Sequence, residues 1–252
     1  MVAGHLRMAL ASWSPTCCHA LLHLLLAGCH RPHAFGRALP VPKAGSPRRH
    51  HAAVHDNVLG RPQQLAARRD SLPEPVRRYL QFAIEDRAPA TRTVRLKHGG
   101  TFRTKPEQRW LPIRGVEYFT AATPGFVWSA SISPALLAWI DVRDRLYDRR
   151  GNMLVKLESL FTIADACGPE IDQGASLRWL AEAVWFPYAF VGGAIRWEPV
   201  SGEAARATLV QQGAPVAPTV EFDAEGRMVL IRGERYRDVG GGKLALTPWV
   251  GR

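Results

Sequence analysis

From residue 94 onward, apolar side chains alternate with polar ones in short runs that are separated by turn residues. In the first run, Val94, Leu96 and His98 alternate with Arg95 and Lys97. A period of two is the pattern of a half-buried strand, because successive side chains point to opposite faces of a sheet. His98 is therefore expected to be an ordinary strand residue and not a catalytic one.

Further runs of the same kind follow in hairpin order and predict an antiparallel meander of about eight to ten strands. Pro124-Gly125, Arg149-Arg150-Gly151-Asn152 and Asp223-Ala224-Glu225-Gly226 carry turn chemistry between them. The predicted strands cover residues 94–98, 110–120, 126–128, 140–147, 153–163, 195–200, 204–210, 219–222 and 228–236.

Two segments have helical periodicity instead. Residues 71–84 place apolar side chains at helical spacing after Ser71, which can cap the helix. The second helix is expected to start at Asp172, with one apolar face and an Arg178–Glu182 pair elsewhere on its surface. Pro187 ends it.

Helices and hairpin strands together predict an α+β fold: a curved, mostly antiparallel sheet, as a half-barrel or open barrel, packed on two helices. Residues 71–252 are expected to form this single domain. A curved sheet of this kind has a concave apolar face, which suits a lipid or another apolar ligand.

Residues 1–70 have a different composition. They hold eight of the nine histidines, three of the four cysteines and only two of the 22 acidic residues. With nine Lys and Arg their formal charge is +7, against +4 (24 minus 20) for residues 71–252. The stretch 30–70 lacks sustained periodicity, so disorder is expected there, and its histidines lack the paired spacing of a metal site.

Two interpretations fit the start of the chain. In the first, an apolar run over residues 17–27 followed by Leu26-Ala27-Gly28-Cys29 is a lipoprotein signal, with Cys29 as the lipidated residue. The protein would then lie at the cell envelope, attached to the membrane through its N-terminus. In the second, the start codon is misassigned and residues 1–70 are translated from DNA upstream of the true start. The protein is then expected to be cytoplasmic.

Residues 71–252 lack the known catalytic motifs. His98 and Cys167 are their only histidine and cysteine, and they contain no Gly-x-Ser-x-Gly, His-Glu-x-x-His or phosphate-binding loop. No cofactor or metal is expected. The weak catalytic candidates are Glu170, Asp172 and Glu182 around the second helix, for which capping and pairing with arginine are the structural alternative.

Aromatic residues supply the candidate ligand-binding set, although core packing is the commoner use of such side chains. Basic residues such as Arg95 and Lys97 alternate along the first strands, with Glu107 and Glu117 among them. This mixture indicates a solvated sheet face, and no nucleic acid is expected as a partner. The candidate ligand-binding residues are Trp128, Trp185, Phe186, Trp197 and Tyr236.

Several stretches of residues 72–252 resemble an uncharacterised bacterial domain family of unknown function, found mainly in high-GC bacteria. The motifs are Leu72-Pro73-Glu74-Pro75-Val76-Arg77-Arg78-Tyr79-Leu80, Arg114-Gly115-x-Glu117-Tyr118-Phe119-Thr120, Pro124-Gly125-Phe126-Val127-Trp128, Gly168-Pro169-Glu170, Leu180-Ala181-Glu182-Ala183-Val184-Trp185-Phe186-Pro187, Arg235-Tyr236 and Thr247-Pro248-Trp249-x-Gly251-Arg252. They identify no reaction.

The resemblance implies two further expectations. Similar proteins continue for some tens of residues, so this chain is expected to lack closing strands at its C-terminus. The predicted arrangement is also similar in outline to lipoprotein-carrier (LolA-like) folds, which is an analogy of fold alone.

Three functions are compatible with these observations. The leading one is a non-enzymatic, envelope-associated domain that binds a lipid or other apolar molecule in a concave sheet. The second is a small hydrolase or isomerase that uses carboxylates near the second helix. The third is a truncated remnant without an independent function.

Overall fold

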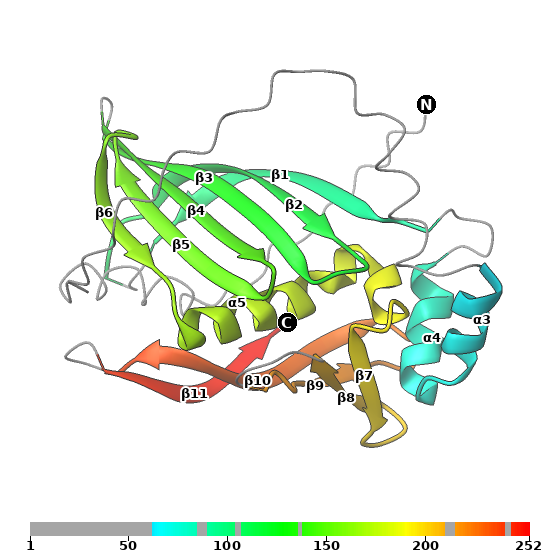
Figure 1. Ribbon diagram of the computed structural model, residues 1–252. Helices are drawn as coiled ribbons and strands as arrows, with labels where there is room; N and C mark the ends of the chain where they lie inside the picture. The colour runs from blue at the N-terminus through cyan, green and yellow to red at the C-terminus, as the bar shows by residue number, and fades with distance from the viewer. Residues whose placement is uncertain (1–61, 85–89, 104–106, 136–137, 210–214, 240–242) are drawn as a thin grey trace, which may run out of the picture.

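A computed structural model describes residues 62–84, 90–103, 107–135, 138–209, 215–239 and 243–252. This part of the chain forms three α-helices and eleven strands, and the strands make two antiparallel sheets. The long helix α5 lies between the two sheets, and α3 and α4 lie together at one end of the molecule (Figure 1). The α+β class and the curved open sheet are confirmed.

The first sheet has six strands in the order of the chain. These are β1 Thr93–Phe102, β2 Leu111–Thr120, β3 Gly125–Ala135, β4 Ala138–Tyr147, β5 Arg150–Leu157 and β6 Phe161–Ala166. The predicted strand over 153–163 is in fact split between β5 and β6 by a tight turn at Glu158 and Ser159, both with positive φ. The preceding turn, between β4 and β5, lies at Asp148 and Arg149, two residues earlier than expected. Both of these residues also have positive φ.

The second sheet has five strands, again in the order of the chain: β7 Ile195–Pro199, β8 Ala204–Leu209, β9 Thr219–Phe222, β10 Met228–Asp238 and β11 Leu244–Gly251. The expectation of one continuous sheet is therefore wrong, because α5 separates two meanders. Within the described ranges neither sheet closes into a barrel.

Helix α5 spans Pro169–Glu182 and is buried on all sides from Gln173 to Leu180. A helix between two sheets must be covered on both faces, so its pattern is not amphipathic. The predicted cap at Asp172 is wrong: the helix starts one turn earlier, after Gly168, whose φ of 124° suits glycine.

Helix α3 spans Pro62–Asp70, so the expectation of disorder is wrong for these residues. It packs on α4, which spans Glu74–Ala83, and its Leu65 contacts the core. Ser71 does not cap α4; its hydroxyl donates to the carbonyl of Arg68 at the end of α3. The predictions for residues 1–61, including lipidation at Cys29, lie outside the described residues.

Aromatic side chains fill the space around α5. The ring of Phe119 on β2 packs against those of Phe126, Trp185 and Phe186, with centroids 6.0, 6.0 and 4.8 Å away. Trp179 of α5 is fully buried and donates from its indole to the carbonyl of Thr120. None of the described helices is long and apolar enough to cross a membrane.

Candidate functional site

The three carboxylates proposed as catalytic lie at opposite ends of α5. Asp172 accepts a hydrogen bond of 2.6 Å from the backbone of Gly151 and lies 3.5 Å from Arg150, while Glu170 is half-buried nearby. Glu182 is the last residue of the helix. Ten residues of helix separate Asp172 from Glu182, about 15 Å along the axis. The structure does not bring these groups together in one site.

Glu182 belongs instead to a buried cluster around Arg178. The Arg178 guanidinium donates to Glu117 at 2.7 Å, to Asp144 at 2.8 Å and to Glu182 at 3.1 Å. It also lies over the rings of Phe126 and Trp128. The Arg178–Glu182 pair predicted from their spacing therefore forms, but in the core and not on the surface.

Strand register brings this cluster together. Glu117 on β2 is opposite Trp128 on β3, and Trp128 is opposite Asp144 on β4. The three side chains therefore form one row on the inner face of the six-stranded sheet, directly beneath α5. Glu117 was expected on a solvated face with the strand arginines, and that expectation is wrong: it is only 2% exposed.

Burial determines the protonation of the cluster. It raises the pKa of Glu117 to about 9; the Arg178 charge opposes this rise, and the Glu182 and Asp144 charges add to it. Burial also raises the pKa of Glu182, whose Oε2 has no hydrogen-bond partner among the described residues. Glu117 is therefore protonated at neutral pH, so Arg178 does not face three charged carboxylates.

His98 extends this network toward the edge of the sheet. Its Nε2 accepts a hydrogen bond of 2.7 Å from the Trp128 indole, and the two rings stack. Burial, followed by the Arg178 charge, lowers the pKa of His98, so the ring is neutral at pH 7. As expected for a strand residue, His98 contacts no candidate nucleophile in the described structure.

The five aromatic residues proposed to bind a ligand lie in separate parts of the molecule. Trp128 is on the first sheet, Trp185 and Phe186 follow α5, and Trp197 and Tyr236 belong to the second sheet. Trp197 packs edge-on against Phe190 at 5.2 Å, within the core. Trp128, Phe186 and Trp197 are buried in the core cluster, so core packing accounts for these three side chains.

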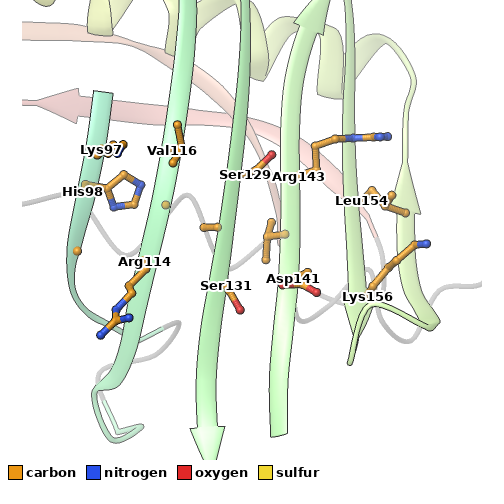
Figure 2. A pocket seen from close by; sticks show the side chains of 14 residues that line it. Lys97, His98, Arg114, Val116, Ser129, Ser131, Asp141, Arg143, Leu154 and Lys156 are labelled. Carbon is orange, nitrogen blue, oxygen red and sulfur yellow. The ribbon is translucent and has the colours of Figure 1, made fainter. Parts of the chain in front are cut away.

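An open trough of about 790 Å³ instead lies on the opposite, outer face of the six-stranded sheet. Two adjacent cross-strand rows form it, as Figure 2 shows. We call this feature the outer trough; its outward-facing residues are Lys97, Val116, Ser129, Arg143 and Leu154 in one row and Gly99, Arg114, Ser131, Asp141 and Lys156 in the other.

The outer trough carries four cationic side chains and one carboxylate. The carboxylate, Asp141, already accepts hydrogen bonds from the Trp139 indole and the Ser159 hydroxyl. In the described part of the chain, Lys97, Arg114 and Lys156 make no ion pair, although Lys156 lies opposite Asp141. Arg143 donates to Asn152, but its Nε is buried without a described partner.

Sequence reasoning missed both features, although a signal for the buried cluster was present. Glu117 is in phase with Ile113 and Phe119, and Asp144 is in phase with Val142 and Leu146, so alternation alone assigns both carboxylates to the inner face. The trough needed the register between five strands, which no single strand encodes.

Neither the curated proteins nor the solved structures contain a match, so the similarity to lipoprotein-carrier folds is not confirmed. The resemblance to a domain family of unknown function is confirmed, and its match includes α3 as well as the sheets. Residues 63–252 match the model described as "Family of unknown function (DUF6544)", and the chain belongs to that family.

Proposed function

We propose that this protein is a non-enzymatic domain that binds an anionic lipid or similar anionic amphiphile in the outer trough. The observation that carries the proposal is the excess of cationic side chains around an open depression of about 790 Å³. This volume is in the range of small-molecule sites, roughly 300–1,000 Å³. The ligand is assigned to the outer face because α5 packs on the inner one.

The polar groups of the outer trough support an anionic partner. Lysine and arginine bind phosphate and carboxylate groups through charge-assisted hydrogen bonds. The one carboxylate, Asp141, is held by Trp139 and Ser159 at the margin of the trough.

The apolar groups of the trough support an amphiphile over a small inorganic anion. Val116 and Leu154 lie in the row that also contains Lys97 and Arg143. Val127, 40% exposed, lies in the next row. An acyl chain laid along this face would cover side chains that are otherwise in water.

Calorimetric titration of the full chain with a short-chain phosphatidylglycerol below its micelle concentration tests the proposal. We expect binding that inorganic phosphate or short-chain phosphatidylcholine does not match, and a loss of about tenfold or more in Lys97→Ala/Arg114→Gln. Lys243→Ala/Arg206→Gln makes the same charge change at exposed positions of the second sheet and its turn. Equal losses in the two variants, or no preference for the anionic lipid, would reject the outer trough as the site.

Location at the cell envelope is a separate part of the proposal and rests on Cys29. If the head is a lipoprotein signal, the intact mass of the native protein will correspond to a chain that begins at an acylated Cys29. A mass for a chain that retains Met1, or that begins near residue 62, would remove this support.

A further inference from the structure

We propose that one end of the six-stranded sheet docks on the surface of a bilayer that contains anionic phospholipid. This end holds the last residues of β1, β3 and β5 and the first residues of β2, β4 and β6. The inference deepens the proposed function, because it names a membrane as the source of the anionic group. We call the surface the hairpin end and define it by its exposed apolar side chains, Trp110, Trp139, Leu160 and Phe161.

Antiparallel order places these four residues at the same end of the sheet. Trp110 precedes β2, Trp139 is the second residue of β4, Leu160 ends the turn after β5, and Phe161 is the first residue of β6. They are 56%, 40%, 74% and 65% exposed, respectively. At about 4.8 Å per strand, the four steps from β2 to β6 span roughly 19 Å. Several large exposed apolar side chains at one end of a sheet within that width indicate an interaction surface.

The two tryptophans are suited to the boundary between headgroups and acyl chains. The Trp139 indole N–H donates to Asp141 at 3.1 Å and to Ser159 at 3.3 Å, so its ring can enter an apolar phase without an unpaired donor. The Arg103 guanidinium lies 4.4 Å from the ring of Trp110. An aromatic ring beside a cation matches an interface where apolar chains meet anionic headgroups.

Charge favours an anionic surface over a neutral one. Arg109 lies at the hairpin end and bonds to the carbonyl of Pro134. Glu107 and Glu158 also lie there and reduce the local charge. The balance is set by the outer trough: its row with Arg114 and Lys156 is nearest to the turns, and Lys97 and Arg143 follow in the next row. A bilayer at the hairpin end would therefore present its headgroups to the trough.

The same features argue against a second copy of the chain as the partner. Stable protein interfaces have a continuous, closely packed apolar centre. Here the four apolar side chains are spread over the ends of separate strands, with charged residues between them. A fluid surface accommodates such a pattern, because lipids rearrange around each side chain.

Vesicle co-sedimentation of the full chain tests the inference. We expect binding to phosphatidylcholine vesicles with about 30% phosphatidylglycerol to exceed binding to pure phosphatidylcholine, and a decrease of about tenfold in Leu160→Ser/Phe161→Ser. The matched control is Val200→Ser/Val229→Ser, which removes exposed apolar side chains elsewhere. Quenching of tryptophan fluorescence by brominated lipid is expected to decrease in Trp110→Phe/Trp139→Phe.

The variants separate this inference from the proposed function. If Leu160→Ser/Phe161→Ser binds vesicles poorly and still binds short-chain phosphatidylglycerol, both proposals stand. If the trough variant Lys97→Ala/Arg114→Gln binds the short-chain lipid normally, the function fails while docking by the hairpin end is still measurable. Three outcomes would each overturn the docking surface. They are unchanged vesicle binding in Leu160→Ser/Phe161→Ser, an equal decrease in the control variant, and a wild-type dimer in sedimentation velocity that Leu160→Ser/Phe161→Ser no longer forms.

Discussion

Arg178 joins three strands and a helix through one side chain. Its guanidinium offers five donors in a planar fork, which lets it contact Glu117, Asp144 and Glu182 at once. A lysine ammonium is a single point of charge and lacks that geometry. The residue type at position 178 is therefore dictated by the three buried carboxyls that it contacts and not by helix propensity.

Replacing Arg178 leaves acidic groups buried without their partner. We expect Arg178→Met to lower the free energy of unfolding by about 3–5 kcal/mol, with Arg178→Lys intermediate. Urea denaturation followed by tryptophan fluorescence measures the change. Arg206→Met, at an exposed position of β8, is the control and should stay within about 0.5 kcal/mol of the wild type. A loss below about 1 kcal/mol in Arg178→Met would show that the cluster does not hold the sheet to α5.

The raised pKa of Glu117 makes the protein less stable as pH rises. Between its ordinary pKa and about 9, the unfolded chain releases a proton that the folded chain keeps. The free energy of unfolding should therefore fall from about pH 5 to about pH 9, by up to about 1.4 kcal/mol per pH unit from this group.

The substitution Glu117→Gln isolates that contribution. An amide keeps the acceptor for Arg178 and cannot ionise, so we expect near-normal stability at pH 7 and a flatter dependence on pH, with Glu182 supplying the remaining slope. Urea denaturation from pH 5 to pH 9 provides the measurement, and exposed Glu203→Gln should keep the wild-type slope. A slope in Glu117→Gln equal to that of the wild type would mean that Glu117 is already ionised in the folded protein.

At the scale of elements, α5 and β5 are held in close contact by a glycine. A Cβ on Gly151 would lie 2.6 Å from the carbonyl oxygen of Ile171 and 2.8 Å from its carbonyl carbon. Both are backbone atoms, so neither can rotate away. The first turn of α5 therefore fits against β5 only because residue 151 has no side chain.

Gly151→Ala should push α5 away from the sheet and lower the free energy of unfolding by about 1–3 kcal/mol. Gly202→Ala is the matched control, because a Cβ there meets no atom within 4 Å. Thermal unfolding by circular dichroism distinguishes the two variants. Equal melting temperatures for both would show that the α5–β5 distance is not tightly fixed.

The elements differ in how far the sequence predicts them. Strands with one buried face are visible as alternation, and α4 is visible as an amphipathic helix, because each pattern reports one face in water. Helix α5 has no such face: Gln173 contacts the carbonyl of Glu234 on β10 while Arg178 contacts the other sheet. A single face was therefore expected where two exist, and the division into two sheets was missed with it.

The candidate sites were predictable to different degrees. The spacing of Arg178 and Glu182 predicted their contact, but not its burial, which depends on Asp144 and Glu117, 34 and 61 residues away from Arg178. The outer trough depends on register across five strands. Of its basic residues only Lys97 was singled out, as part of a solvated face, since a sequence alternation shows which side a residue takes and not which residues are its neighbours.

At the scale of the whole molecule, both sheets pack on α5, so neither sheet can unfold without uncovering a buried face of the helix. We expect the chain to unfold in one cooperative transition, with near-UV and far-UV circular dichroism coincident in urea. Coincidence would also contradict the view of the chain as a remnant without a stable fold. Two separate transitions would show that the sheets are independent units.

The order of the strands has a consequence for the kinetics of folding. Within each meander every strand pairs with its neighbour in the chain, so these pairings close short loops and are expected to form quickly. Enclosing α5 is different, since it joins residues 93–166 to residues 195–251 and removes Arg178 and Gln173 from water in the same step. Substitutions in α5 should then mainly accelerate unfolding and leave the folding rate nearly unchanged, so that the lifetime of the folded protein is set by the helix between its sheets.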